Sequence, residues 1–588
     1  MGYTIIEDFS AGLDARRIPI AVKPGSMTLC ENCHVTQGGD VESRKAFVPT
    51  YSLPAGTIGL ASGGGTHYVF GSGPEPSGIP AGVSYQRLQN PVAPSEALIE
   101  IISCDFFNSV PYVVARFDSG SVIHFYNGTY VSDFSQIQQV VTGNSTVYQR
   151  LADQIEEGGL FTVTFPGGVM NITTPGGTDE FGVNCGINLN GSESTGSTLG
   201  LTDYVPGVGP FTVTSADITI GGSFNPRATY YVILYHVNTG TQIMAQVTGL
   251  LTIYRSVVAT HRSKMYATAG ALLYFSALQN PFAWYLTPEG EYEDERGFVN
   301  VGNQTRNPGE ITAIVAHNGK TAVFMRNSIQ LWNLSEKQAA NAFLQSLNET
   351  GTIAPNSCIE VAGLDTFYLS DSGIRSLRAR EIADGAFISD AGAAIDPLVR
   401  DHMLSLSYGA VQSARAILEP TDGRLWMALG DRIYVLSRFP DNRISAWSIY
   451  YPGFTVEGMS VLNGRAWVRA GDVIYCYGGL DGDVYPAPNT VQNRVRMPFH
   501  HFGKPGHLKS NLAFDIAGLG SWDVRLLTNY NDPGDYSTVG TLSGSTYNVG
   551  RINTPRNATH IALEFGSAAG GRNLLAQVVF HYTIDGEK

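Results

Sequence analysis

The sequence contains little charge, few cysteines and no long apolar run. Charged residues make up 15% of its 588 residues, and six cysteines are scattered at positions 30, 33, 104, 185, 358 and 476. Sparse cysteines are typical of reduced residues in a protein made in the cytosol. No stretch approaches the roughly 18 consecutive apolar residues of a membrane-spanning helix. Met1–Asp8 lacks the basic and apolar regions of a secretory signal. We therefore expect neither a membrane span nor a signal peptide.

Basic residues are also few, and they do not cluster. The 37 Lys and Arg residues against 51 Asp and Glu residues give a formal net charge of −14. A protein that reads nucleic acid by sequence normally presents a basic face, so the charge disfavours that class. The net negative charge is still compatible with a protein that repels nucleic acid.

What the sequence has in abundance is turns between short apolar strands. Its 67 Gly and 29 Pro residues accompany 43% hydrophobic residues, the profile of a β-rich globular protein. One pattern recurs: a short strand, a turn that contains Gly, Asn or Asp, and a second strand. It is found in Ile311–Trp332, Val361–Leu377, Ile417–Leu436 and Val461–Tyr475. An Asn-Gly pair favours a tight hairpin because both residues accept positive φ. Such meanders at intervals of about 40–50 residues predict a β-propeller.

The same pattern predicts an all-β protein with five segments. A helix signal at Ser145 or Thr146, followed by strands at Phe161–Phe165 and Val169–Thr173, interrupts the blade pattern. Pro486 and Pro488 mark a linker after the last blade. The predicted segments are a proline-broken, irregular N-terminal segment at 1–55, the first part of the propeller at 56–142, an inserted small α+β domain at 143–250, the second part of the propeller at 251–487 and a C-terminal β-sandwich at 488–588.

One motif with metal-site spacing lies in the N-terminal segment. Cys30-Glu-Asn-Cys33-His34 matches the C-x-x-C-H pattern of haem attachment. Covalent haem attachment takes place outside the cytosol, and the flanks are rich in proline. The sequence also has no second C-x-x-C or paired His motif that would complete a zinc site. We interpret the motif as structural, without haem or metal.

The remaining candidate sites favour a structural interpretation as well. Gly319-Lys320-Thr321 lacks the earlier glycine of a phosphate-binding loop and is predicted to be a hairpin turn. His500, His501 and His507 have metal-like spacing without clear Cys or carboxylate partners. Three further segments are interpreted as turns or solvated loops rather than as sialidase-type or cation-binding motifs: Ser370–Gly373, Glu291–Glu295 and Asp481–Asp483. No catalytic, cofactor-binding or metal-binding residue is predicted, and we expect the protein not to be an enzyme.

Residues in several segments resemble one protein family. They are Asp8–Leu13, Cys30–Cys33, Gly39–Val41 and Arg44 near the N-terminus, and His261–Tyr266, Leu273–Ser276, Pro281–Trp284 and Phe367–Arg375 in the blades. Together with the insertion containing Ile172–Pro175, they resemble the nozzle family, or tail tubular protein B, of short-tailed bacteriophages (podoviruses). Lys45-Ala46 departs from the family, which tends toward Gly or Pro after the Arg.

The resemblance implies a structural component of the virion tail, made in the host cytoplasm. It implies a homohexameric ring or tube that extends the portal and adaptor channel and conducts double-stranded DNA during ejection without binding it specifically. Further partners would be the tail adaptor, contacted through segment 1–55, and tail fibres or spikes. The negative charge fits this function, since a lumen of like charge lets the duplex slide.

Two alternatives stay open. One is a polysaccharide-binding or polysaccharide-degrading β-propeller of a phage or cell surface, which would need a concave pocket with carboxylates and aromatic residues. The other is a cytosolic propeller scaffold that binds peptide partners.

Overall fold

The structure, a computed structural model, describes most of the chain. The described residues are 2–91, 93–131, 256–284, 296–304, 309–363, 365–382, 390–554, 556–567 and 569–585, together with the strands β15 to β24 between residues 162 and 248. The chain forms two compact units, one made of residues 1–117, 123–135 and 254–588 and the other of residues 118–122 and 136–253.

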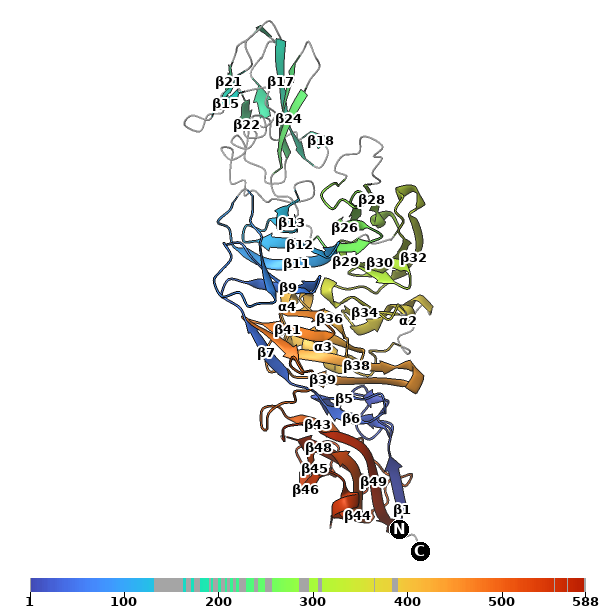
Figure 1. The fold of residues 1–588 in the computed structure, drawn as a ribbon. Helices are drawn as coiled ribbons and strands as arrows, with labels where there is room; N and C mark the ends of the chain where they lie inside the picture. The colour runs from blue at the N-terminus through green and yellow to red at the C-terminus, as the bar shows by residue number, and fades with distance from the viewer. Residues whose placement is uncertain are drawn as a thin grey trace. The chain divides into compact units, whose positions relative to one another are not determined.

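A β-propeller forms the larger part of the first unit, which confirms the predicted fold class (Figure 1). The innermost strands of seven of the described sheets, one of which extends to nine strands, contact one another in a closed circle, in the order in which they follow along the chain. These strands are β8 (Ile58–Gly63), β11 (Leu98–Phe107), β25 (Val258–His261), β29 (Ile311–His317), β33 (Ile359–Val361), β36 (Arg415–Glu419) and β40 (Gly458–Leu462). The contact between β40 and β8 closes the circle.

Each inner strand is followed by the outer strands of its own blade. The outer strands are β9 (Thr66–Gly71) and β10 (Val83–Arg87); β12 (Val110–Phe117), β13 (Val122–Tyr126) and β14 (Thr129–Tyr130); β26 (Lys264–Ala269), β27 (Leu272–Phe275) and β28 (Gly297–Asn300); β30 (Lys320–Met325), β31 (Ser328–Asn333) and β32 (Ala342–Asn348); β34 (Asp365–Ser370) and β35 (Gly373–Ser376); β37 (Arg424–Leu429), β38 (Arg432–Phe439) and β39 (Ile444–Tyr450); and β41 (Arg465–Ala470) and β42 (Val473–Tyr477). Short helices lie between some strands: η3 (Val301–Gln304), η4 (Gln338–Ala340), η5 (Pro355–Ser357), α2 (Leu377–Ile382), α3 (Asp396–Ser405), α4 (Tyr408–Gln412) and η6 (Pro440–Asn442).

The Asn-Gly pairs form hairpin turns, as the sequence predicts. Asn318 and Gly319 have φ of 48° and 72° between β29 and β30, and Asn463 and Gly464 have φ of 50° and 70° between β40 and β41. Two successive residues with positive φ match the twist of the flanking strands. These turns set the register of their blades.

A strand from the N-terminal segment completes the last blade. β7 (Phe47–Ser52) pairs antiparallel with β42, with Ser52 opposite Val473 and Phe47 opposite Tyr477. The last blade of the propeller therefore contains strands from before the first blade and from the end of the repeat region, and their pairing stabilises the closed ring.

The strands after residue 488 form two sheets that share one core. They are β43 (Asn493–Arg496), β44 (Lys509–Leu519), β45 (Ser521–Leu527), β46 (Tyr536–Ser543), β47 (Ile552–Asn553), β48 (Ala562–Ser567) and β49 (Leu574–Ile584), with the one-turn helix α5 (Thr546–Val549). Trp522 and Phe565 from one sheet and Phe580 from the other are fully buried in the same cluster. This is a β-sandwich.

The N-terminal segment, which the sequence indicates as irregular, instead contains seven short strands. Besides β7 they are β1 (Gly2–Ile6), β2 (Gly12–Leu13), β3 (Ser26–Met27), β4 (Leu29–Glu31), β5 (Cys33–Val35) and β6 (Val41–Ser43). β1 and β6 pair with β49 in one sheet of the sandwich, and β4 lies between β39 and β43 in the other. Strands of two to six residues carry too little alternation to be recognised locally, and β1, β4, β6 and β7 have partners that lie hundreds of residues away.

In the second unit, β17 (Glu180–Leu189), β23 (Thr229–His236) and β24 (Gln242–Thr248) form an antiparallel sheet with β18 (Ser192–Glu193) and β20 (Gly207–Val208). Smaller sheets contain β15 (Thr162–Thr164), β16 (Asn171–Thr173) and β21 (Thr212–Thr214), and β19 (Leu199–Leu201) and β22 (Ile218–Ile220). The predicted hairpin corresponds to the antiparallel pair β15 and β16. The helix predicted from Ser145 lies outside the described residues. Over the part of the chain that is described, no helix has the length and apolar character to cross a membrane.

Candidate functional site: a buried junction, two sheet edges and an axial cavity

Cys30, Cys33 and His34 lie in the core where the propeller meets the sandwich. Both thiols are fully buried, and the Cys30 thiol donates to the carbonyl oxygen of Cys33 at 3.7 Å. Burial raises the pKa of both thiols, so both are protonated. Burial also lowers the pKa of His34, whose Nδ1 lies 2.7 Å from the hydroxyl of Tyr450. Among the described residues no group of three or more His, Cys, Asp or Glu side chains is arranged to hold a metal.

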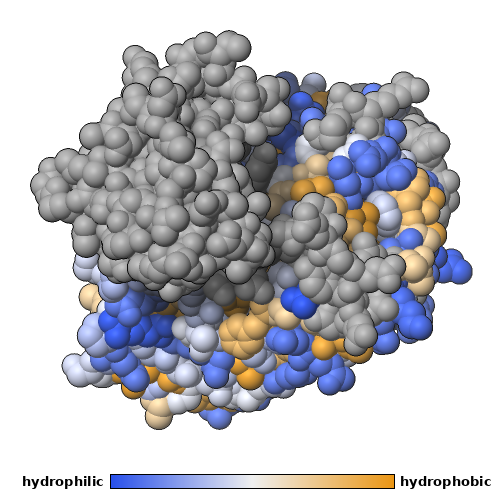
Figure 2. All heavy atoms as spheres, turned by 90° about the horizontal axis from the view of Figure 1, so that it is seen from above, coloured by the Kyte–Doolittle hydropathy of each residue, from blue (hydrophilic) through white to orange (hydrophobic). Residues whose placement is uncertain are grey.

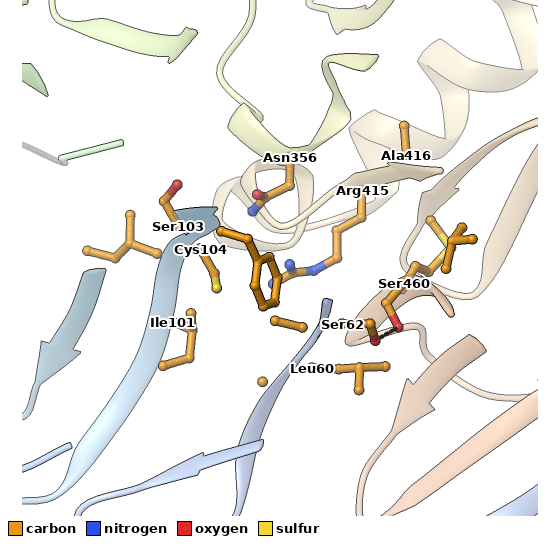
Figure 3. A pocket seen from close by; sticks show the side chains of 15 residues that line it. Leu60, Ser62, Ile101, Ser103, Cys104, Asn356, Arg415, Ala416 and Ser460 are labelled. Carbon is orange, nitrogen blue, oxygen red and sulfur yellow. Dashed lines mark hydrogen bonds between the residues drawn. The ribbon is translucent and has the colours of Figure 1, made fainter. Parts of the chain in front are cut away.

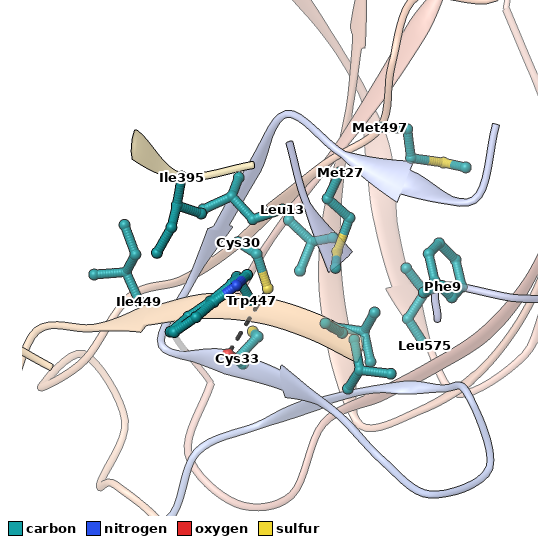
Figure 4. Packing of buried hydrophobic residues seen from close by; sticks show 14 of the residues in the cluster. Phe9, Leu13, Met27, Cys30, Cys33, Ile395, Trp447, Ile449, Met497 and Leu575 are labelled. Atoms are coloured by element: carbon teal, nitrogen blue, oxygen red, sulfur yellow. Dashed lines mark hydrogen bonds between the residues drawn. The ribbon is translucent and has the colours of Figure 1, made fainter. Parts of the chain in front are cut away.

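The two cysteines belong to a cluster to which the N-terminal segment, the fifth and sixth blades and the sandwich contribute (Figure 4). Phe9, Leu13 and Met27 come from the N-terminal segment, Trp447 and Ile449 from β39, and Met497 and Leu575 from the sandwich. The first residues quoted for the family resemblance, around Phe9, Leu13 and Cys30–Cys33, are therefore packing residues of this junction.

Arg44, another residue of the resemblance, holds the junction by hydrogen bonds. Its side chain is almost fully buried, and its Nε donates to Oδ1 of Asn32 at 3.0 Å. Its Nη1 and Nη2 donate to the carbonyl oxygens of Lys45 and Tyr451 at 2.9 and 3.1 Å. The guanidinium also lies 5.0 Å from the centre of the Phe47 ring. A buried guanidinium is stable where its donors are satisfied in this way, so Arg44 connects the N-terminal segment to blade six.

Gly12 permits the closest backbone approach at the junction. Its φ is +63°, and a Cβ at this position would lie 2.5 Å from the Cα of Ala446. No other residue type fits both the conformation and the space.

A second buried polar network lies where α2 and α3 follow β35. Arg375 pairs with Asp396 at 2.6 Å and lies 3.5 Å from Asp390, which also pairs with Arg380 at 3.2 Å. These side chains are buried except for that of Asp396. The network fixes the two helices against the fifth blade and is not visible as a motif in the sequence.

The other sequence candidates occupy turns and loops. Gly319–Thr321 forms a hairpin turn, as predicted, and Ser370–Gly373 joins β34 to β35. Asp481 and Asp483 are exposed, and an oxygen of Asp483 lies 3.9 Å from Nζ of Lys45. Glu291–Glu295 lies outside the described residues.

The three histidines near residue 500 belong to a loop held by a buried lysine. Nζ of Lys509 donates to the carbonyl oxygens of Lys504, His507 and Thr559 at 2.6, 2.9 and 2.8 Å. His500 is buried, which lowers its pKa to about 4, whereas His507 is exposed. The rings of His501 and His560 lie 5.9 Å apart. The lysine already supplies the positive charge around which this loop is arranged.

β1 and β46 are two of the strands at the margins of the sandwich that have one neighbour each among the described strands. β1 pairs with β49 alone, and β46 pairs with β45 alone. Neither strand contains a charged residue or proline. On β1, Tyr3 and Ile5 are 67% and 46% exposed. β46 contains a bulge opposite Val524 and Arg525, whereas the pairing of β1 is regular. An uncharged, regular edge with exposed apolar side chains is a template for pairing with another chain.

A cavity of about 370 Å³ lies between the inner strands of the propeller (Figure 3). Its walls come from β8, β11, β36 and β40, and Asn356 of η5 adds a polar group. Ser62 donates to Oγ of Ser460 at 2.8 Å and lies 2.7 Å from Nδ1 of His67. Burial lowers the pKa of His67 to about 4, so the imidazole is neutral. This Ser–His pair is a weak candidate for nucleophilic catalysis, because a general base works best with a pKa near the operating pH. The lining residues are dispersed between residues 59 and 461, so no sequence motif predicts them.

Comparisons with known proteins add two distant structural similarities. No protein-family model matches the chain, and no curated protein sequence matches it. A catalytically inactive virginiamycin B lyase from Staphylococcus aureus with quinupristin is 9% identical, with a TM-score of 0.23, over 54% of this chain and 97% of that chain. A yeast heterotrimeric nucleoporin complex is 9% identical, with a TM-score of 0.22, over 46% of this chain and 80% of that chain. Similarities of this size do not bear on activity, substrate or partners.

Proposed function

We propose that this protein is a non-catalytic, ring-forming subunit of the tail of a short-tailed bacteriophage, a nozzle through which DNA leaves the capsid. The observation that carries the proposal is the uncharged edge strand β1 with exposed Tyr3 and Ile5. A closed ring of identical subunits joins two unlike faces of each chain. β1 and β46 provide two such edges in one sandwich.

Charge supports the same function. With a net charge of −14 per chain, six copies would carry −84 (6 × −14), of which the lumen-facing share acts on the duplex. Salt screens this field within about 8–10 Å, so it acts inside a narrow bore. The partners proposed from the resemblance are the tail adaptor, tail fibres or spikes and passing double-stranded DNA, and the proposed location is the virion tail.

The described propeller surface also carries exposed apolar side chains outside β1. On the face drawn in Figure 2, hydrophobic and hydrophilic residues are interspersed over the described surface. Leu404 on α3 is 85% exposed, more than either side chain of β1 discussed above. Exposure alone therefore does not mark the subunit contact; the open backbone edge of β1 distinguishes it.

The test replaces Ile5 with Lys and compares the result with Leu404→Lys. A lysine on an edge strand opposes strand pairing, so Ile5→Lys should leave monomers while Leu404→Lys still forms rings. Light scattering after gel filtration and negative-stain images, with and without the adaptor, measure the outcome. Monomers for the unmodified chain even with its adaptor, or cleavage of a glycan, would contradict the nozzle function. Rings formed by Ile5→Lys would contradict the assigned edge alone.

The polysaccharide-degrading alternative lacks a supporting observation in the propeller cavity. A glycosidase pocket needs a pair of carboxylic acids. Over the part of the chain that the structure describes, the residues that line the axial cavity include no Asp or Glu. We therefore propose no glycan chemistry there.

A further inference from the structure

The axial cavity has the size and position of a small-molecule site. Its volume of about 370 Å³ lies within the range of roughly 300–1,000 Å³ typical of ligand pockets. The inner strands that form it belong to blades that are neighbours around the ring, namely those of β36, β40, β8 and β11. Strands packed in a closed ring hold their side chains rigidly, so the cavity is pre-formed.

Among the described residues that line this cavity there is one cation and no carboxylate. Arg415 reaches into it from β36, as Figure 3 shows. The other titratable lining group, the Cys104 thiol, is neutral because burial raises its pKa. A guanidinium has five N–H donors, so Arg415 can keep a contact elsewhere and still donate to a ligand in the cavity. Because Arg415 is the one charged side chain among the described lining residues, the lining favours a ligand with a negative group.

Neutral donors stand beside the guanidinium. Because Ser62 donates to Ser460, the Ser460 hydroxyl keeps its own proton for another acceptor. The side-chain amide of Asn356 also lines the cavity. Ile101, Phe106 and Met459 supply apolar wall on β11 and β40. The lining therefore divides into an anion-binding part and an apolar part.

We propose that the axial cavity binds a small organic anion. Its carboxylate, phosphate or sulfate group accepts hydrogen bonds from Arg415, Asn356 and Ser460, and its apolar body packs on Ile101, Phe106 and Met459. A charge-assisted, bidentate contact with Arg is the strongest interaction available in such a site. The proposal does not depend on ring formation, and it assigns the propeller axis a binding role separate from the subunit contact.

Calorimetric titration of the full-length protein with four probes tests this assignment. Phenyl phosphate and benzoate carry an anion and an apolar ring, benzyl alcohol carries the ring alone, and inorganic phosphate carries the charge alone. We expect one or both aromatic anions to bind at least about tenfold more tightly than benzyl alcohol and inorganic phosphate, because each part contributes about 1.4 kcal/mol or more. Which of the two aromatic anions binds more tightly identifies the preferred head group.

Two variants and one control connect binding to the cavity. Arg415→Gln should weaken the aromatic anion by at least about tenfold, and Ser460→Ala by about threefold, in line with the loss of a charged and a neutral hydrogen bond. Arg400→Gln, at an exposed position on α3, should bind as the unmodified protein does. Circular dichroism verifies the fold, and Ser460→Ala decides if Arg415→Gln does not fold. Equal binding of benzyl alcohol, unchanged binding in both cavity variants, or no binding of any probe at about 10 mM would overturn the proposal.

Discussion

The blades and the terminal sandwich are both antiparallel β-structures, yet they are assembled over different distances along the chain. The fourth blade uses β29 to β32, which follow one another within Ile311–Asn348. In the sandwich, Gly2 lies opposite Tyr582, and β4 lies between strands of blade six and of the C-terminal region. The blades therefore depend on local turns, whereas the sandwich and the junction depend on long-range packing. Substitutions in the two regions should differ accordingly.

The largest effect is expected for Gly12→Ala at the junction. The new Cβ would meet the backbone of Ala446, and the residue would keep a φ of +63°. Backbone cannot move aside as a flexible side chain can, so we expect a loss of about 3–5 kcal/mol in the free energy of unfolding. Chemical denaturation of both proteins measures it.

Gly464→Ala in a blade hairpin is the matched control. Gly464 also has positive φ, at +70°, but a Cβ there would have no heavy atom within 4 Å. We expect a cost of about 1 kcal/mol, from the conformation alone. Equal losses at the two glycines would show that the close approach at Gly12 contributes nothing.

Cys33→Ser at the junction and Cys358→Ser in the propeller should differ less in their loss of free energy of unfolding. Cys33 is fully buried in the apolar cluster, whereas Cys358 is partly exposed. Placing a hydroxyl in the apolar cluster should cost about 1–3 kcal/mol, and the change at Cys358 should cost less than about 1 kcal/mol.

The same samples test the interpretation of the Cys-x-x-Cys-His motif. We expect no Soret band and no stoichiometric zinc in the unmodified protein. Zinc that is lost in Cys33→Ser would contradict it.

Buried histidines should make both regions sensitive to acid. Burial lowers the pKa of His67 in the first blade and of His500 in the sandwich to about 4, against an ordinary value near 6.5. Between these values the unfolded chain binds a proton that the folded chain does not, so stability falls as the pH drops from about 6.5 to about 4. Each residue contributes a slope of up to about 1.4 kcal/mol per pH unit.

Melting temperatures measured across that pH range test this expectation. His67→Gln and His500→Gln should each flatten the pH dependence, and His507→Gln, at an exposed position, is the matched control. A pH dependence that is the same in all three variants would mean that other groups titrate in this range.

The sequence predicts what is local and misses what is not. The propeller follows from turns such as Asn318-Gly319, whose conformation is determined by the two residues themselves. The strands β1 to β6 could not be predicted, because a strand such as Leu29–Glu31 acquires its conformation from partners on β39 and β43. The same reason hides the Arg44 network and the axial cavity. Both bring together segments that are distant in sequence, so no single segment contains the pattern that would predict them.

The smallest effect on the first unit is expected from removing much of the second. The inner strands on either side of the insertion, β11 and β25, contact each other, so the ring of blades closes without residues 145–248. Ser103 of β11 reinforces that contact, since its Oγ accepts from the backbone N–H of Val258 at 3.2 Å. Deleting 145–248 and joining the ends with a short Gly/Ser linker should therefore leave a soluble, β-rich protein. Its free energy of unfolding should lie within about 1 kcal/mol of that of the first unit in the full chain, because a flexible linker changes loop-closure entropy only slowly with length.

Circular dichroism with denaturant titration measures this free energy. Ser103→Ala, introduced into the shortened chain, should lower its stability by about 1 kcal/mol. Loss of cooperative unfolding on deletion alone would mean that the propeller needs the insertion to close.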